Sequence, residues 1–97
     1  MPGAIRYGDF CKGHADWGSR PNDEASEDVI INGLGAHRKD DHWTTHCNGD
    51  PECHDSRAAE GSSNVFVNGQ PLCREDDHTY CGSKMGATKS PDVIING

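Results

Sequence analysis

The sequence has few apolar residues and no long apolar run. Hydrophobic residues fill 32% of its 97 positions, and no stretch approaches the length needed to span a bilayer. A chain this small with so little apolar material gains little stability from its core alone. We therefore expect disulfide bonds or a bound metal to supplement the core.

Positive charge and helical patterning are also scarce. Nine Lys and Arg residues face sixteen Asp and Glu, which gives a formal net charge of −7. Such a surface repels phosphate groups, so the composition argues against nucleic-acid binding and against electrostatic docking to anionic lipid. The best helical candidate is the short segment 56–60.

Motifs of the common enzyme classes are missing as well. No glycine-rich loop suggests a phosphate cradle, and no Ser-His-Asp or Cys-His arrangement lies in a strand-turn-helix context. His42 and His46 have the spacing of the two histidines in a zinc-protease helix, but Trp43 stands where that motif has its catalytic glutamate. The sequence therefore argues against an enzyme.

What the sequence does contain is a threefold repeat. The pattern Ser-x-[Asp/Asn]-Val-x-[Ile/Val]-Asn-Gly ends at Gly33, Gly69 and Gly97. β-branched or aromatic residues followed by Asn-Gly predict a short strand that enters a type I′ turn, because Asn and Gly tolerate positive φ. The residues after the turn repeat too, so we predict two hairpins of one design over about 28–41 and 64–77.

The third copy, over residues 92–97, lacks a return strand, and the N-terminus supplies one. Residues 2–9 fit the register and place an Arg and an Asp, Arg6 and Asp9, where the other repeats have them. We predict a single domain over 1–97, in which the N-terminal strand pairs with the C-terminal strand. The pairing closes a ring of three hairpins and removes free sheet edges. Arg6, like its two counterparts, is expected to form an internal ion pair or turn brace.

The five cysteines and six histidines are the candidates for forming disulfide bonds or binding a metal. Because five is odd, at least one thiol is free or bound to a metal. The chain opens directly onto a predicted strand with no signal peptide, so we expect synthesis in a reducing cytoplasm, which favours a metal over disulfides. A bond between Cys47 and Cys53 is therefore disfavoured, although an oxidising exterior would allow it. Cys11 and Cys73 are expected to be small buried packing residues.

Three metal-binding residues occupy nearly equivalent positions in the connectors between hairpins. His14, His46 and Cys81 follow the aligned aspartates by five, five and four residues, so we expect them to meet on the pseudo-threefold axis. Structural zinc is usually four-coordinate, and one more donor is needed. His54 is preferred because the longest connector has the slack to fold back. The alternatives are His37, His42 and His78.

Five groups of residues together resemble a known family. They are residues 6–9, 13–14, 41–46, 61–71 and 81–82. The pattern, which covers nearly the whole chain, resembles the PAAR-repeat proteins, the cone-shaped tips of trimeric spikes in type VI secretion systems and contractile-tailed phages. The family's Pro-Ala-Ala-Arg tetrad is altered here in all three repeats, and Asp-Asp replaces its Gly-Asp at Asp40 and Asp76.

The resemblance implies a fold, a metal site and a partner. Family members bind one zinc ion near the tip through three histidines and a cysteine, which carry over here as His14, His46, His54 and Cys81. The fold would be a small all-β cone of three pseudo-threefold β-hairpins, monomeric on its own. One copy would cap a trimeric β-helical spike and meet a target membrane only mechanically, either in a virion or secreted at the tip of an injection machine.

Two other functions fit parts of the sequence. A small zinc-dependent hydrolase or toxin would use the same metal-binding residues, and a secreted binding module would be held by a disulfide. If the protein is a spike tip, its alternating apolar residues must form both the core and the surface that docks on the spike. Ile30, Phe66 and Ile94 form one set, and the other consists of Val29, Ile31, Val65, Val67, Val93 and Ile95. Either set is a candidate for the docking surface.

Overall fold

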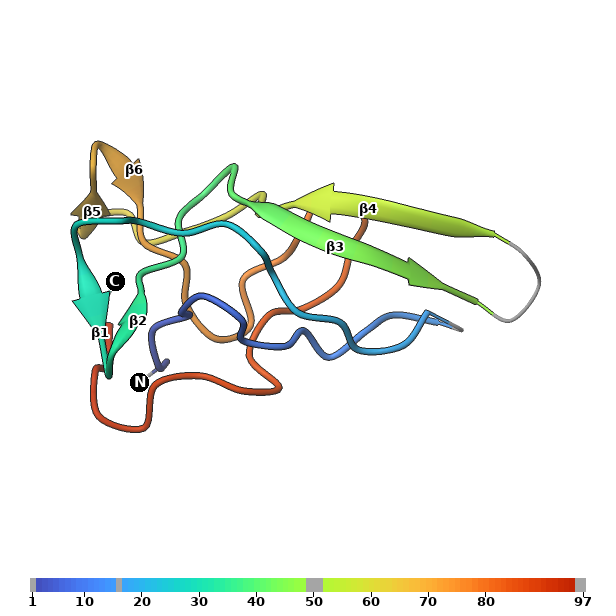
Figure 1. The fold of residues 1–97 in the computed structure, drawn as a ribbon, viewed down its shortest axis with the longest axis horizontal. Helices are drawn as coiled ribbons and strands as arrows, with labels where there is room; N and C mark the ends of the chain where they lie inside the picture. The colour runs from blue at the N-terminus through green and yellow to red at the C-terminus, as the bar shows by residue number, and fades with distance from the viewer. Residues whose placement is uncertain (1, 16, 49–51, 96–97) are drawn as a thin grey trace.

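The structure is all-β. It is a computed structural model that describes residues 2–15, 17–48 and 52–95 (Figure 1). Its six strands are β1 (Ile30–Ile31), β2 (Leu34–Gly35), β3 (His42–Cys47), β4 (Cys53–Arg57), β5 (Phe66–Val67) and β6 (Gln70–Pro71). None of these residues forms a helix that could cross a membrane. Segment 56–60, the best helical candidate, is not helical, because its first residues belong to β4.

The two predicted hairpins are β1–β2 and β5–β6, each an antiparallel pair. Their turns have positive φ at both central residues, 54° and 79° at Asn32-Gly33 and 53° and 80° at Asn68-Gly69. These are the type I′ turns that the sequence predicts. The ladders are shorter than predicted, because the residues after β2 and β6 pair with neighbouring repeats instead, as in the bridge between Arg38 and Leu72.

A cyclic set of three backbone hydrogen bonds joins the repeats. The amide of Ile5 donates to the carbonyl of Cys73 (3.1 Å), Cys73 donates to His37 (3.0 Å), and His37 donates to Ile5 (3.0 Å). These residues occupy the same position in the three repeats and are fully buried. Each repeat thus supplies the partner that a buried amide of another repeat requires, which closes the ring.

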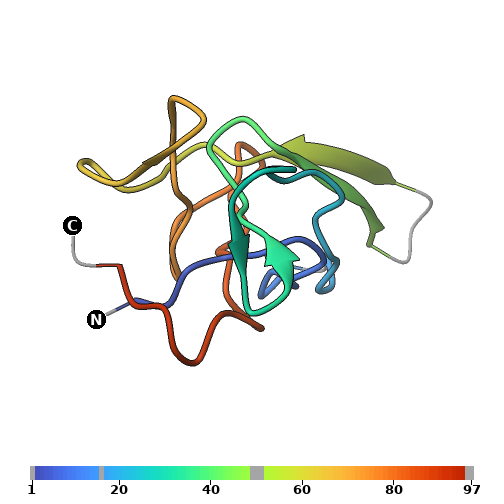
Figure 2. The same ribbon diagram turned by 60° about the vertical axis from the view of Figure 1, so that its left-hand side comes forward.

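The two ends of the chain complete the third unit. The Ala4 amide donates to the carbonyl of Val93 (2.9 Å), and the Ile95 amide donates to Pro2 (2.8 Å). Figure 2 shows the two terminal segments side by side. The predicted pairing of the N-terminal with the C-terminal strand is confirmed. The predicted third turn, at 96–97, lies outside the described residues.

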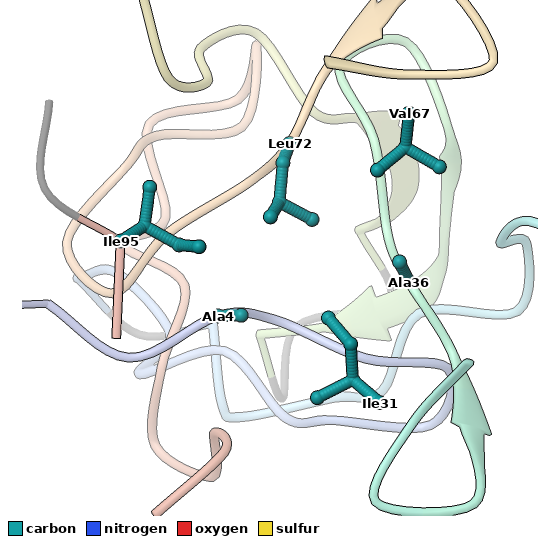
Figure 3. Close-up of a cluster of buried hydrophobic side chains, with 6 residues drawn as sticks. All are labelled: Ala4, Ile31, Ala36, Val67, Leu72 and Ile95. Atoms are coloured by element: carbon teal, nitrogen blue, oxygen red, sulfur yellow. The ribbon is translucent and has the colours of Figure 1, made fainter. Parts of the chain in front are cut away.

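The core beneath the ring has the same threefold pattern. Each repeat contributes two buried side chains that point toward a common centre (Figure 3): Ala4 and Ile95, Ile31 and Ala36, Val67 and Leu72. The alternate set, Ile30, Phe66 and Ile94, is exposed. Of the other set, Ile31, Val67 and Ile95 form the core, whereas Val29 and Val93 are exposed.

A second buried cluster lies beside the first. It contains Ile5, Cys11, Trp43, Ala58, Cys73 and Met85. Cys11 and Cys73 are fully buried free thiols, as the sequence predicts. Trp43 is the largest fully buried side chain.

An Arg-Asp brace recurs in every repeat. Arg6 bonds Asp9 (2.9 Å), Arg38 bonds Asp41 (2.8 Å) and Arg74 bonds Asp77 (2.9 Å), which confirms the predicted internal ion pairs. Between each pair lies a residue with left-handed backbone: Gly8, Asp40 and Asp76, with φ of 80°, 74° and 71°. Two repeats therefore place aspartate in a conformation that favours glycine.

No strands were predicted in residues 42–63, the longest of the connectors between the repeat hairpins. These residues contain β3 and β4, the longest hairpin among the described residues. Thr44 and Thr45 favour a strand, and Trp43 anchors β3 in the core. In Figure 1 this hairpin extends along the long axis, away from β1–β2 and β5–β6. We call its end of the molecule the tip, and the end with β1–β2, β5–β6 and the paired termini the base.

Cys47 and Cys53 form a disulfide, so the expectation that they stay reduced was wrong. They are opposite partners in the β3–β4 register. Antiparallel pairing brings such side chains together, whatever compartment is inferred from composition. The free cysteines of the described residues are Cys11, Cys73 and Cys81.

Candidate metal centre

Four donor side chains converge toward the tip. The ligand atoms of His14, His46, His54 and Cys81 all lie within 4.8 Å of one another. His46 and His54 face each other across β3 and β4, whereas His14 and Cys81 come from loops. The arrangement gathers one imidazole or thiol from each of four segments that are separate in the sequence.

Local backbone geometry positions the imidazoles. The β3–β4 register shifts between Trp43 and His46, and this irregularity pairs His46 with His54. In the first loop, the backbones of His14 and Trp17 exchange two hydrogen bonds of 2.9 and 2.7 Å. Gly13 precedes this turn with φ of 74°, and a Cβ there would lie 2.5 Å from the Trp17 carbonyl oxygen. Only glycine fits this place, so Gly13 fixes the approach of His14.

The ε nitrogens of the three imidazoles lie close together. Nδ1 of His46 donates to the carbonyl of Gly18 (2.7 Å), which leaves Nε2 of neutral His46 without a proton. That Nε2 lies 2.6 Å from Nε2 of His54, which lies 3.3 Å from Nε2 of His14. A tetrahedral ion with metal–nitrogen bonds near 2.0–2.1 Å would hold such atoms about 3.3 Å apart. The His14–His54 separation matches this value and the His46–His54 separation is shorter, so the donors are close enough together to share one metal ion.

The fourth donor is the Cys81 thiol, whose surroundings favour the deprotonated thiolate form. Burial alone would raise the pKa of Cys81, but hydrogen bonds from Thr79, Ser83 and Arg20 outweigh it and lower that pKa to about 4. Thr79 Oγ1 lies 3.1 Å from the sulfur. Because the thiolate is the form that ligates metals, Cys81 suits the role without further proton loss at neutral pH.

A comparison with protein-family models identifies the family of this chain. The family model described as PAAR motif matches residues 22–87, more than half of the chain. The chain belongs to the PAAR-motif family. The predicted resemblance is thereby confirmed, and the match is consistent with a spike-tip protein of a contractile injection system. The matched segment of this PAAR protein contains His46, His54 and Cys81, while His14 precedes it. No curated protein matches the chain.

Two residues beside the donors were not predicted from the sequence as parts of the site. The ring of Trp17 stacks on His14 (5.0 Å between centroids) and lies 4.9 Å from His54, so it covers two of the donors. Arg20 is buried and donates to the Cys81 sulfur. Only their closeness to His14 in the sequence could have suggested either residue.

The three alternative histidines lie apart from this PAAR protein's donor group. His37 is buried in the core, and that burial lowers its pKa to about 4. His42 lies between Asp55 and Asp23, whose carboxylates accept its hydrogen bonds and raise its pKa. His78 bonds Glu60 at 2.8 Å. Each of the three already has a separate local partner.

Proposed function

We propose that this PAAR protein is the structural tip of a contractile injection machine, and that one copy caps the blunt end of a trimeric β-helical spike. The observation that carries the proposal is a threefold set of exposed apolar side chains at the base. Ile30, Phe66 and Ile94 occupy equivalent repeat positions and are 56%, 57% and 43% exposed.

A threefold base on a single chain suits a trimeric partner. Three equivalent contacts can form at once when the pseudo-threefold axis of the tip coincides with the axis of the spike. Val29, Leu34 and Val93 adjoin the set and are also exposed. Contiguous exposed apolar residues are typical of protein interfaces. Docking would cover them and the open strand edges at the end of the spike.

We further propose that His14, His46, His54 and Cys81 hold one Zn²⁺. Three imidazoles and a thiolate are typical zinc ligands, and four protein ligands leave no open coordination position for water. The ion would be structural, because it joins β3, β4 and two loops at the tip. In this proposal the protein has no catalytic activity and acts mechanically.

We also propose that residues 1–97 form one PAAR domain, located in a phage virion or at the exposed tip of a secretion machine. The disulfide and the metal site would both stabilise the tip. They use successive pairs of the β3–β4 register, Cys47 with Cys53 for the disulfide and His46 with His54 for the metal. The acidic composition, with a net charge of −7, favours a protein partner over nucleic acid.

The test is co-purification with the candidate trimeric spike, followed by native mass spectrometry. One PAAR chain for three spike chains is expected. Phe66→Glu should abolish the complex, because it places a charge in the apolar base. Tyr80→Glu is the matched control, since Tyr80 is 64% exposed but lies beside Asp40, away from the base. A complex that survives Phe66→Glu, or another stoichiometry, would contradict this docking mode.

A further inference from the structure

Arg20 is a buried cation without a carboxylate partner. Its side chain is 3% exposed, and within residues 2–15, 17–48 and 52–95 no Asp or Glu forms an ion pair with it. A buried charge needs compensation by hydrogen bonds or an opposite charge. The groups that accept its hydrogen bonds therefore indicate its role.

The guanidinium of Arg20 reaches four acceptors. Nε donates to the Thr44 carbonyl (2.9 Å), and one terminal nitrogen donates to Cys11 Sγ (3.0 Å) and Ser83 Oγ (3.2 Å). The other terminal nitrogen donates to Cys81 Sγ (3.4 Å). Thr44 lies on β3, two residues before the donor His46. One side chain thus connects the strand of one metal-binding residue to the sulfur of another.

We propose that Arg20 is a positioning residue of the metal centre, which orients the Cys81 sulfur through an N–H···S hydrogen bond and ties it to β3. This inference rests on the proposed metal site. The planar guanidinium presents several donors in a fixed geometry, which a lysine ammonium cannot reproduce. Outer residues of this kind orient the ligands of a metal and tune its bonds.

The orientation of Arg20 is itself fixed by its surroundings. Its guanidinium carbon lies 5.5 Å from the ring centroid of Trp43, in a cation–π contact. Its backbone carbonyl accepts from the Cys11 amide (3.0 Å), and its backbone amide donates to Cys11 Sγ (3.5 Å). Arg20 therefore donates to the Cys81 sulfur from a position that contacts with the core have fixed.

The N–H···S bond has a spectroscopic consequence. It withdraws electron density from the sulfur, and hydrogen bonds to a ligating sulfur are known to tune the electronic properties of metal sites. Without Arg20, a more electron-rich Cys81 thiolate should release charge to the metal more easily. The sulfur-to-metal charge-transfer absorption should then move to longer wavelength.

The experiment uses Co²⁺ as the probe, with wild type, Arg20→Met and Arg20→Lys. Arg57→Met is the matched control, because it removes an exposed guanidinium from β4 that contacts Glu24 and none of the four donors. We expect every variant to bind one Co²⁺. In Arg20→Met the charge-transfer band should move to longer wavelength, and affinity should fall about 10- to 100-fold. Arg20→Lys should change both in the same direction, and Arg57→Met neither.

The outcomes separate this inference from the proposed function. An unchanged band and unchanged affinity in Arg20→Met, with Co²⁺ bound to the wild type, would overturn the role of Arg20 and leave the metal site intact. A wild type without cobalt–thiolate absorption would overturn both. If Arg20→Met does not fold, Arg20→Lys decides, since it keeps the positive charge and loses the branched contacts. Wild-type values in Arg20→Lys would then refute the proposal.

Discussion

His37 should make the stability of this protein sensitive to acid. Its imidazole is fully buried, Nδ1 donates to the Glu24 carbonyl (2.7 Å), and Nε2 has no hydrogen-bond partner within the described ranges. Burial lowers the pKa of His37 from 6.5 to about 4. As the pH falls below 6.5, His37 becomes protonated in the unfolded chain, whereas in the native protein it stays neutral down to about pH 4. The free energy of unfolding therefore decreases across this interval.

The size of this effect follows from the two pKa values. Between pH 7.5 and 5.0 the contribution of His37 to the free energy of unfolding falls by about 2 kcal/mol, and the full difference below pH 4 is about 3 kcal/mol. His37→Leu should remove this pH dependence. Leucine suits the position, because the equivalent residues are Ile5 and Cys73. The lost hydrogen bond to Glu24 should cost about 1 kcal/mol at both pH values.

Urea unfolding of the zinc-loaded protein at pH 7.5 and 5.0 measures this difference. The metal site is the same in wild type and variant, so its contribution cancels when the two pH-dependent changes are subtracted. If His37→Leu loses as much stability as wild type between these pH values, the assignment of the acid sensitivity to His37 is refuted.

Three further predictions concern the tip and the turns. Chelation should lower the melting temperature, because zinc at about 1,000 times its Kd adds about 4 kcal/mol to the free energy of unfolding. Cys81→Ser should weaken zinc binding. An unchanged melting temperature after chelation would exclude a structural ion. Alkylation of the unreduced, denatured, metal-free protein should modify the three free cysteines and spare Cys47 and Cys53; modification of all five would show that the disulfide is absent. Asp40→Gly should raise stability by about 1 kcal/mol, because φ there is 74°; a lower melting temperature would show that the Tyr80 hydroxyl bond to Asp40 matters more.

The repeat architecture was predictable because its signals are local. Asn-Gly after β-branched or aromatic residues, as at Asn32 and Asn68, specifies the turn through backbone preference alone. The alignment of residues 2–9 with the other return strands then indicated the closed ring. The direction of each apolar set was not predictable, because strand alternation defines two faces without saying which one is covered.

The tip was harder to read from the sequence. Residues 42–57 do contain an Asn-Gly pair, Asn48-Gly49, but it lies outside the repeat pattern, and the histidines and cysteines around it suggested metal ligands in a connector rather than strands. The Cys47–Cys53 bond depends on register, whereas the argument for reduced thiols used only compartment. Arg20 illustrates the same limit, because a buried arginine is unusual and only tertiary contacts account for it.

The cyclic hydrogen bonds among Ile5, His37 and Cys73 have a consequence for folding kinetics. Each bond joins residues distant in sequence, and an isolated two-stranded hairpin is at best marginally stable in water. Loop closure must therefore precede most of the stabilising contacts, which slows folding. On the ribosome, the ring cannot close before residues 93–95 emerge and meet the N-terminal segment. We expect a single cooperative transition, and a chain that lacks any one repeat should remain unfolded.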